Sequence, residues 1–122
     1  MGKEALKRVL ADHQAKAIGR MIRTSPRKLN LVAQSIRGMK AGNALNELTF
    51  SPKRVARVVK KVLESAIANA EHNHRLNPAS LIVKEAVAGT ATTFKRVTPK
   101  ARGSMGPILK RNCHVKIILS DL

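Results

Sequence analysis

Apolar residues recur at helical spacing through the middle of the chain. They follow the i, i+3, i+4, i+7 pattern of an amphipathic helix, at Val55, Val58, Val59, Val62, Leu63, Ala66, Ile67 and Ala70. At about 100° per residue the basic residues of this stretch fall in the opposite arc, at Lys53, Arg54, Arg57, Lys60 and Lys61. Ser51 and Pro52 offer an N-cap and a first-turn proline. The pattern predicts a helix from Ser51–Pro52 to about Asn73, with one apolar face and one cationic strip.

A second helix is predicted before it. Ser25 is an N-cap candidate, Pro26 occupies the first helical position, and Gly38 can end the helix in the left-handed conformation. Apolar residues at helical spacing lie between them, at Leu29, Val32, Ala33 and Ile36. Asn43 is expected to cap a short further helix. The first twelve residues are polar and helix-prone, and we treat 1–12 as an N-terminal extension.

Three segments read as strands. Residues 13–23 allow one, and Leu81 to Ala88 form a second in which Leu81, Val83 and Val87 share a face. The C-terminal segment alternates apolar and polar residues from Cys113 to Ser120, which indicates a half-buried strand. The last two strands are expected to pair as an antiparallel hairpin packed on the helices, within one domain spanning 1–122.

The connection between these two strands is unusually long. Residues 89–107 are rich in glycine, proline and cations, and hold few large apolar groups. A loop of this length inside a compact domain is usually functional or disordered. If it continues the hairpin, ten residues out and ten back give an arm about 30 Å long. We therefore expect an extended arm at 88–107, ordered only when it binds a partner.

Charge then indicates the partner. The chain has 122 residues, 24 Lys and Arg against 7 Asp and Glu, and a formal net charge of +17. Residues 13–46 and 86–120 contain no acid at all. A folded body this basic seeks a polyanion, with nucleic acid the leading candidate and an anionic membrane surface the second. With no Trp, no Tyr and two Phe, stacking of single-stranded bases is nearly excluded.

Other residue types give little support for catalysis. The lone Cys113 alternates with core positions and reads as a small buried hydrophobe, while His114 points to the opposite strand face. His72 and His74 lack the further ligands of a metal site and suit the end of a helix. We predict no enzyme activity, metal or cofactor. Two binding classes stay open: structured RNA held by its backbone, and DNA held by an architectural protein with a basic β-arm.

Four segments carry longer motifs, in a fixed order along the chain. The long predicted helix contains Val62-Leu63-Glu64-Ser65-Ala66-Ile67-Ala68-Asn69-Ala70-Glu71-His72-Asn73. Before it stands Ser25-Pro26-Arg27-Lys28, followed by Leu31-Val32-Ala33, Ile36-Arg37-Gly38 and Lys40. After it come Lys95-Arg96-Val97-Thr98-Pro99-Lys100-Ala101-Arg102-Gly103 and then Ile108-Leu109-Lys110-Arg111. Together these segments resemble the L-twenty-two family of large-subunit ribosomal proteins, in which the last two correspond to the hairpin tip and the returning strand; the resemblance covers the chain from about residue 14 onward.

The resemblance implies an α+β fold: three helices packed on a three-stranded antiparallel sheet, with a long protruding β-hairpin. It implies a structural constituent of the large subunit that binds and bridges large-subunit rRNA during assembly, on a cytoplasmic or organellar ribosome, without a membrane and not as a stand-alone homo-oligomer. The tip, Lys95 to Arg102, would line the exit tunnel, facing ribosomal protein L-four and the nascent polypeptide. Predicted rRNA contacts, joining this resemblance to the charge pattern, are Lys16, Arg20, Arg23, Arg27, Lys28, Arg37, Lys40, Lys53, Arg57, Lys60, Lys110 and Arg111.

Overall fold

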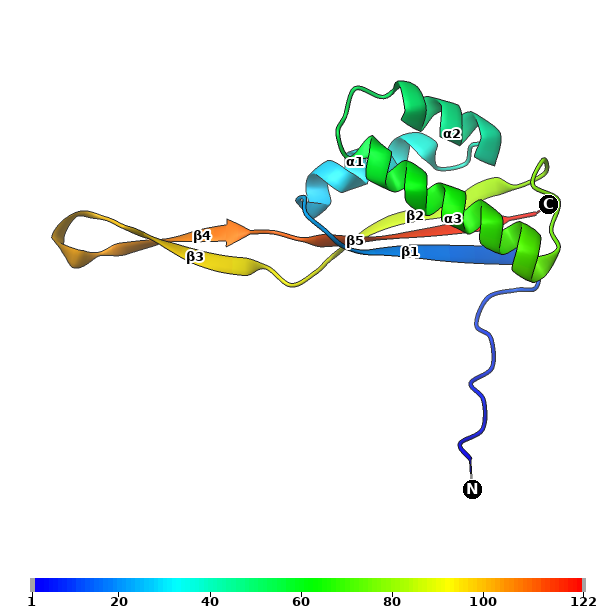
Figure 1. Cartoon of the computed structure of the whole chain (residues 1–122), viewed down its shortest axis with the longest axis horizontal. Coiled ribbons are helices and arrows are strands. Elements are labelled where there is room, and N and C mark those ends of the chain that lie inside the picture. Colours follow the sequence, from blue (N-terminus) through cyan, green and yellow to red (C-terminus); the bar gives the residue numbers. More distant parts are fainter. Residues whose placement is uncertain (1, 122) are drawn as a thin grey trace.

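A computed structural model describes residues 2–121 and shows an α+β fold (Figure 1). Three helices cover one face of a three-stranded antiparallel sheet, and a two-stranded hairpin projects from one end of that sheet. The N-terminal segment leaves the opposite end. The fold class predicted from the sequence is therefore confirmed.

The sheet has its C-terminal strand in the centre. β5 (Cys113–Ser120) pairs with β1 (Gln14–Ile22) on one side and with β2 (Ile82–Thr90) on the other. Successive side chains of β5 point to opposite faces of the sheet. Val115, Ile117 and Leu119 lie on the face that the helices cover, and all three are buried. All three strands were predicted within two residues of their ends.

α1 (Pro26–Ile36) begins and ends as predicted. The Ser25 hydroxyl accepts a hydrogen bond from the Lys28 N–H at 3.4 Å, and Pro26 opens the helix. Gly38 follows with φ of +77°, a conformation that costs a glycine no steric strain. Leu29, Val32, Ala33 and Ile36 are buried, and the helix packs on β2.

The predicted starts of the next two helices are wrong. α2 (Ala41–Phe50) begins before Asn43 because its entry is fixed from outside: the Ala41 N–H donates to Leu81 O at 2.9 Å. α2 then runs through to Phe50, so that Ser51 is its C-cap in extended conformation. The chain reverses direction over the next residues, and α3 (Ala56–His74) begins four residues after Pro52. The predicted end of α3 near Asn73 is confirmed.

α3 supplies five buried residues to the core. It packs along β1 and β5, and the side chain of Leu63 is fully buried. Val58, at the edge of the predicted apolar face, stays 39% exposed. Close packing requires Gly19 on β1, because a Cβ atom there would lie 2.7 Å from Cγ2 of Val62.

One strand face was predicted wrongly. Leu81 and Val83 are buried as expected, whereas Val87 is 43% exposed and Ala86 takes the buried position. The register against β5 shifts between Val83 and Glu85. An extra residue in a strand sends every following side chain to the other face, which accounts for the exchange.

The arm is a regular hairpin rather than an open loop. β3 (Phe94–Pro99) pairs with β4 (Met105–Lys110), and the short 3₁₀ turn η1 (Ala101–Gly103) joins them. β2 continues in the main sheet to Thr90, so the arm proper begins later than residue 88. At the junction the buried Asn112 accepts from the Ala91 N–H through its backbone and donates through its side chain to Thr92 O at 2.8 Å.

The N-terminal extension is not helical over residues 2–12, contrary to the prediction. It is attached to the body through Arg8, whose guanidinium donates to Gln14 O and lies 3.9 Å from the Asp12 carboxylate. Residue 1 lies outside the described residues. No helix within residues 2–121 is long and apolar enough to cross a bilayer.

Candidate nucleic-acid interface

The structure exposes almost all the predicted RNA-binding cations. Eleven of the twelve side chains are on the surface, and the exception, Lys60, is partly exposed and lies 3.9 Å from the Glu64 carboxylate. They fall in three places. β1 carries Lys16 and Arg20. The surface around α1 and the start of α3 carries Arg27, Lys28, Arg37, Lys40, Lys53 and Arg57. The base of the arm carries Arg23, Lys110 and Arg111.

Two basic segments far apart in sequence meet at the base of the arm. Arg23 follows β1, Arg111 follows β4, and the Arg23 guanidinium donates to Arg111 O at 2.6 Å. The chain bends here, since Met21 has φ of +54° and its N–H donates to Nδ1 of His114 at 3.1 Å. The two acid-free windows of the sequence therefore each supply cations to the base of the arm.

The cationic strip of the long helix is shorter than predicted. Because α3 begins at Ala56, Lys53 and Arg54 lie in the connection before it and only Arg57, Lys60 and Lys61 are helical. Lys53 and Arg54 instead lie beside the start of α1, where they line a cleft with Lys28. Arg54 belongs to the cationic strip predicted from the sequence, but it is not among the predicted rRNA contacts.

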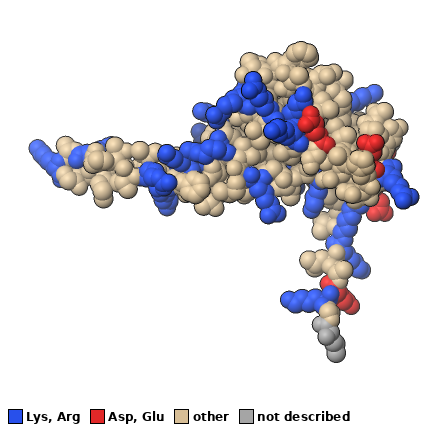
Figure 2. Space-filling view, in the orientation of Figure 1, with Lys and Arg blue, Asp and Glu red and all other residues tan. Residues whose placement is uncertain are grey.

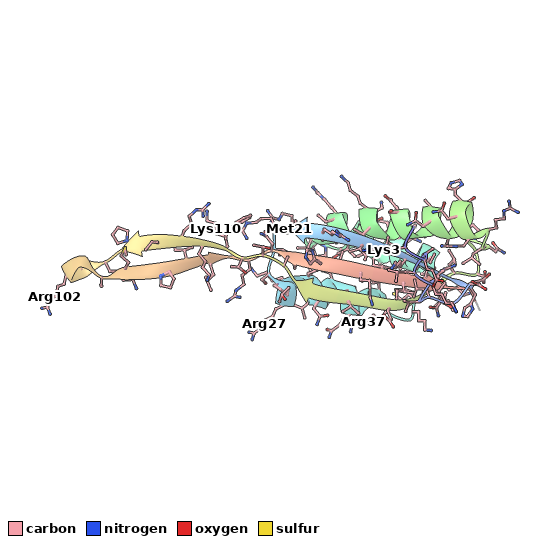
Figure 3. All side chains as sticks on the ribbon, turned by 90° about the horizontal axis from the view of Figure 1, so that it is seen from below. Lys3, Met21, Arg27, Arg37, Arg102 and Lys110 are labelled. Atoms are coloured by element: carbon pink, nitrogen blue, oxygen red, sulfur yellow. The ribbon has the colours of Figure 1, made fainter. Side chains whose placement is uncertain are left out.

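Arg37 has a structural role that the sequence did not reveal. Its Nε donates to Ala86 O on β2 at 2.7 Å, and one of its Nη atoms donates to the Asn30 side chain at 2.9 Å. The guanidinium therefore fastens the end of α1 to an edge strand. Figure 3 shows Arg27 and Arg37 on the same side of the molecule, with Lys110 on the other.

Replacing Arg37 with alanine is expected to lower the free energy of unfolding by about 1 kcal/mol, because two hydrogen bonds from a charged group are lost at a partly exposed site. Urea unfolding of the isolated protein measures this. Arg27→Ala is the matched control, since Arg27 is exposed on the same helix and makes no side-chain hydrogen bond within residues 2–121. Equal stability of the two variants would contradict a structural role for Arg37.

The arm carries different chemistry on its two faces. Strand alternation places Lys95, Val97 and Pro99 on the face of Met105, Pro107 and Leu109, and Phe94, Arg96 and Thr98 on the face of Gly106, Ile108 and Lys110. Every residue from Phe94 to Met105 is exposed. Of the predicted tip, Lys95 and Arg96 lie near the start of β3, on the side of the arm closer to the body, while Lys100, Ala101 and Arg102 belong to the turn. Arg102, with φ of +57°, occupies the far end of the arm (Figure 3).

Negative charge lies away from this surface. Figure 2 shows Lys and Arg along the arm and at the end of the body that faces it, with Asp and Glu farther off. Within residues 2–121 three ion pairs form: Arg8–Asp12, Lys60–Glu64 and Lys116–Glu85. The cations at the base of the arm are in none of them. Unneutralised, exposed cations without intervening acids are the electrostatic feature of a nucleic-acid interface.

The other reactive side chains lie apart from any site. Cys113 is buried as predicted, its thiol donates to Ile22 O at 3.6 Å, and burial raises its pKa above the ordinary value against the effect of a backbone hydrogen bond from Thr24. His114 binds the Met21 N–H instead of Cys113. No group of three metal-ligating side chains comes together among residues 2–121.

Known proteins are similar to this chain over nearly its whole length. The model of the family described as ribosomal protein L22p/L17e matches residues 17–120. Curated relatives named large ribosomal subunit protein uL22 include that of Rhodospirillum rubrum, 56% identical over 99% of this chain and 96% of its own, and that of Beijerinckia indica, 54% identical over 100% and 95%. The relative from Ruegeria is 56% identical over 96% and 93%. The resemblance inferred from the sequence is thus confirmed, and the chain belongs to the ribosomal protein L22p/L17e family.

Proposed function

We propose that this protein is a structural constituent of the large ribosomal subunit that holds large-subunit rRNA through its exposed cations. The observation that carries the proposal is the meeting of Arg23 and Arg111 at the base of the arm, where neither cation takes part in an ion pair of residues 2–121. Membership of a ribosomal protein family makes the chain a structural protein rather than an enzyme. The relatives are bacterial proteins, which favours the ribosome of the cytoplasm over an organellar one.

The mechanism that the geometry supports is scaffolding. Lys and Arg side chains on the body and on the arm neutralise phosphates of different RNA segments, which lowers the repulsion between those segments and lets them approach during assembly. Contacts of this kind read backbone shape and need few aromatic residues. The family assignment supports this reading over the alternative of an architectural DNA-binding protein, which relied on the basic arm alone.

The arm has a separate role in the proposal. It extends from the body as a narrow hairpin (Figure 1) whose residues 94–105 are all exposed. A narrow, basic projection can pass between RNA helices and present its tip on their far side. We therefore propose that residues 95–102 line the peptide exit tunnel, where they face ribosomal protein L-four and the nascent polypeptide.

Deleting Lys95 and Arg96 tests the role of the tip. The deletion shifts the pairing of β3 with β4, but both side chains are exposed and the arm supplies no residue to the core. The free energy of unfolding of the globular part is therefore expected to change by no more than about 0.5 kcal/mol. Ribosomes carrying the deletion should show altered passage of stalling peptides or altered sensitivity to macrolides that bind the tunnel. Translation assays and drug-inhibition curves measure these effects.

Leu63→Ala provides the contrasting control, because loss of this buried side chain should cost about 2–5 kcal/mol of stability. A deletion of Lys95 and Arg96 that destabilises the isolated protein to a similar extent would show that the tip belongs to the folded core. Unchanged stalling and unchanged drug response in ribosomes that contain the deleted protein would contradict the tunnel role.

A further inference from the structure

Two adjoining clefts lie where the end of β1, the start of α1 and the start of α3 meet. One has a volume of about 340 Å³ and the other about 350 Å³. They share Thr24, Arg54 and Val55 as a common wall. We call the pair the Thr24 crevice. Its basic lining residues are Arg23, Lys28, Lys53, Arg54 and Arg57.

The crevice collects positive charge without any acid. Neither cleft has an Asp or Glu in its lining, and none of the five cations takes part in the ion pairs of residues 2–121. The helix ends add to this charge. α1 and α3 both begin at the crevice, neither has an acidic residue in its first turn, and α3 has no side-chain cap. Helix N-termini carry partial positive charge that favours anions.

Thr24 adds a hydrogen-bonding group to the charge of the crevice. The residue is 9% exposed, and its backbone N–H donates a hydrogen bond to Ile22 O at 2.9 Å. Its hydroxyl takes part in none of the side-chain hydrogen bonds of residues 2–121, yet no fully buried side-chain oxygen in this part of the chain lacks a partner. The hydroxyl oxygen therefore keeps some accessible surface, and Thr24 lines both clefts, so that the hydroxyl is available to donate to an oxygen of an incoming group.

We propose that the Thr24 crevice binds two successive phosphates of one RNA strand. The hydroxyl of Thr24 donates to a phosphate oxygen, Arg54 lies between the two phosphates on the shared wall, and the other cations flank them. Threonine hydroxyls, arginines and helix N-termini are the usual donors to nucleic-acid phosphates. The apolar side chains of Val55 and Leu31 in the same lining suit the ribose carbons between them. The inference rests on the proposed function, since it assumes that rRNA is the partner.

The test measures binding of the full chain to protein-free large-subunit RNA over a series of salt concentrations. Arg54→Gln is expected to reduce the slope of log K against log salt by about one, the effect of one lost phosphate contact. Thr24→Val is expected to weaken binding about tenfold with the slope unchanged, because the lost donor is neutral. Ethylation interference should then locate the change at one or two adjacent phosphates.

The controls match each change. Arg75→Gln removes the same charge at the far end of α3, and Thr49→Val removes a hydroxyl on α2; both residues are exposed, and both variants should bind as the unaltered protein does. If Thr24→Val fails to fold, Thr24→Ser and Arg54→Gln carry the comparison, with Thr24→Ser expected to bind normally.

Three outcomes would overturn the proposal. Equal slopes for Arg54→Gln and Arg75→Gln, with normal affinity of Thr24→Val, would show that the protein binds RNA through its overall charge and that the crevice makes no specific phosphate contact. Normal RNA binding of both crevice variants, together with poor incorporation into subunits when other proteins are present, would assign the crevice to an acidic protein segment. Salt-independent binding of the unaltered protein would instead contradict the proposed function itself.

Discussion

Raising the salt concentration from 50 to 200 mM is expected to weaken binding of this protein to large-subunit RNA by about 10³–10⁵-fold. The factor follows if the cationic surface neutralises about 6–10 phosphates, since each neutralised phosphate releases condensed counterions. The chain has enough free cations for this number of phosphates, because eleven of the twelve predicted contact side chains are exposed and only Lys60 among the twelve is in an ion pair of residues 2–121. Filter binding across a salt series measures the affinity directly.

A double variant at the base of the arm sharpens this experiment. Lys110→Gln combined with Arg111→Gln should lower the slope of log K against log salt by about two, one for each phosphate lost. Arg75→Gln, at the other end of the body, should leave the slope as it is. A flat salt response of the unaltered protein would contradict the electrostatic account, and a double variant with an unchanged slope would remove the base of the arm from the interface.

Hydrogen exchange on the isolated protein is expected to separate the arm from the body. Amides of β3 and β4 should exchange at close to the rates of an unfolded chain, whereas those in the middle of α3 should be slower by at least about 10³-fold. The arm is a lone two-stranded ladder, and such hairpins are at best marginally stable in water. Its residues from Phe94 to Met105 are all exposed, while Leu63 and Ala66 on α3 are fully buried.

The same measurement on the RNA-bound protein gives the second half of the expectation. Protection of β3 and β4 should appear when RNA is added, as the ordering of the arm is offset by its new contacts. Amides of β5, in the centre of the sheet, serve as the reference for the body, which we propose unfolds as one unit. Equal protection of arm and α3 in the free protein would show that the arm is stabilised by the body itself.

Local signals in the sequence predicted elements well where the chain decides its conformation locally. The Ser25–Pro26 pair starts α1 as expected, and the apolar repeat of α3 is buried through Leu63 and Ala66. The identical Ser51–Pro52 pair does not start a helix, because α2 extends to Phe50 and takes Ser51 as its end. Both pairs look alike within a few residues, and only the packing of the neighbouring helix distinguishes them.

The candidate site shows the same division. The exposed cations could be predicted from the sequence, because stretches of the chain that contain Lys and Arg but no Asp or Glu can be recognised without a structure. Which cations meet, and which serve the fold, depends on tertiary placement. The contact of Arg23 with Arg111 joins residues 88 positions apart, and Arg37 reaches a carbonyl 49 positions away. Nothing in the sequence around Thr24 indicates a binding residue. Its importance follows only from the two clefts that it lines in the folded chain.

The junction at Asn112 has a consequence for how such a protein can change over evolutionary time. The buried Asn112 joins the two chain segments there through its hydrogen bonds with Ala91 and Thr92, and the exposed strands beyond it supply no side chain to the core. Insertions or losses that come in equal numbers on β3 and β4 keep the ladder paired and leave the core untouched. Selection can therefore lengthen, shorten or recharge the arm to suit its surroundings, while the globular part is inherited almost unaltered.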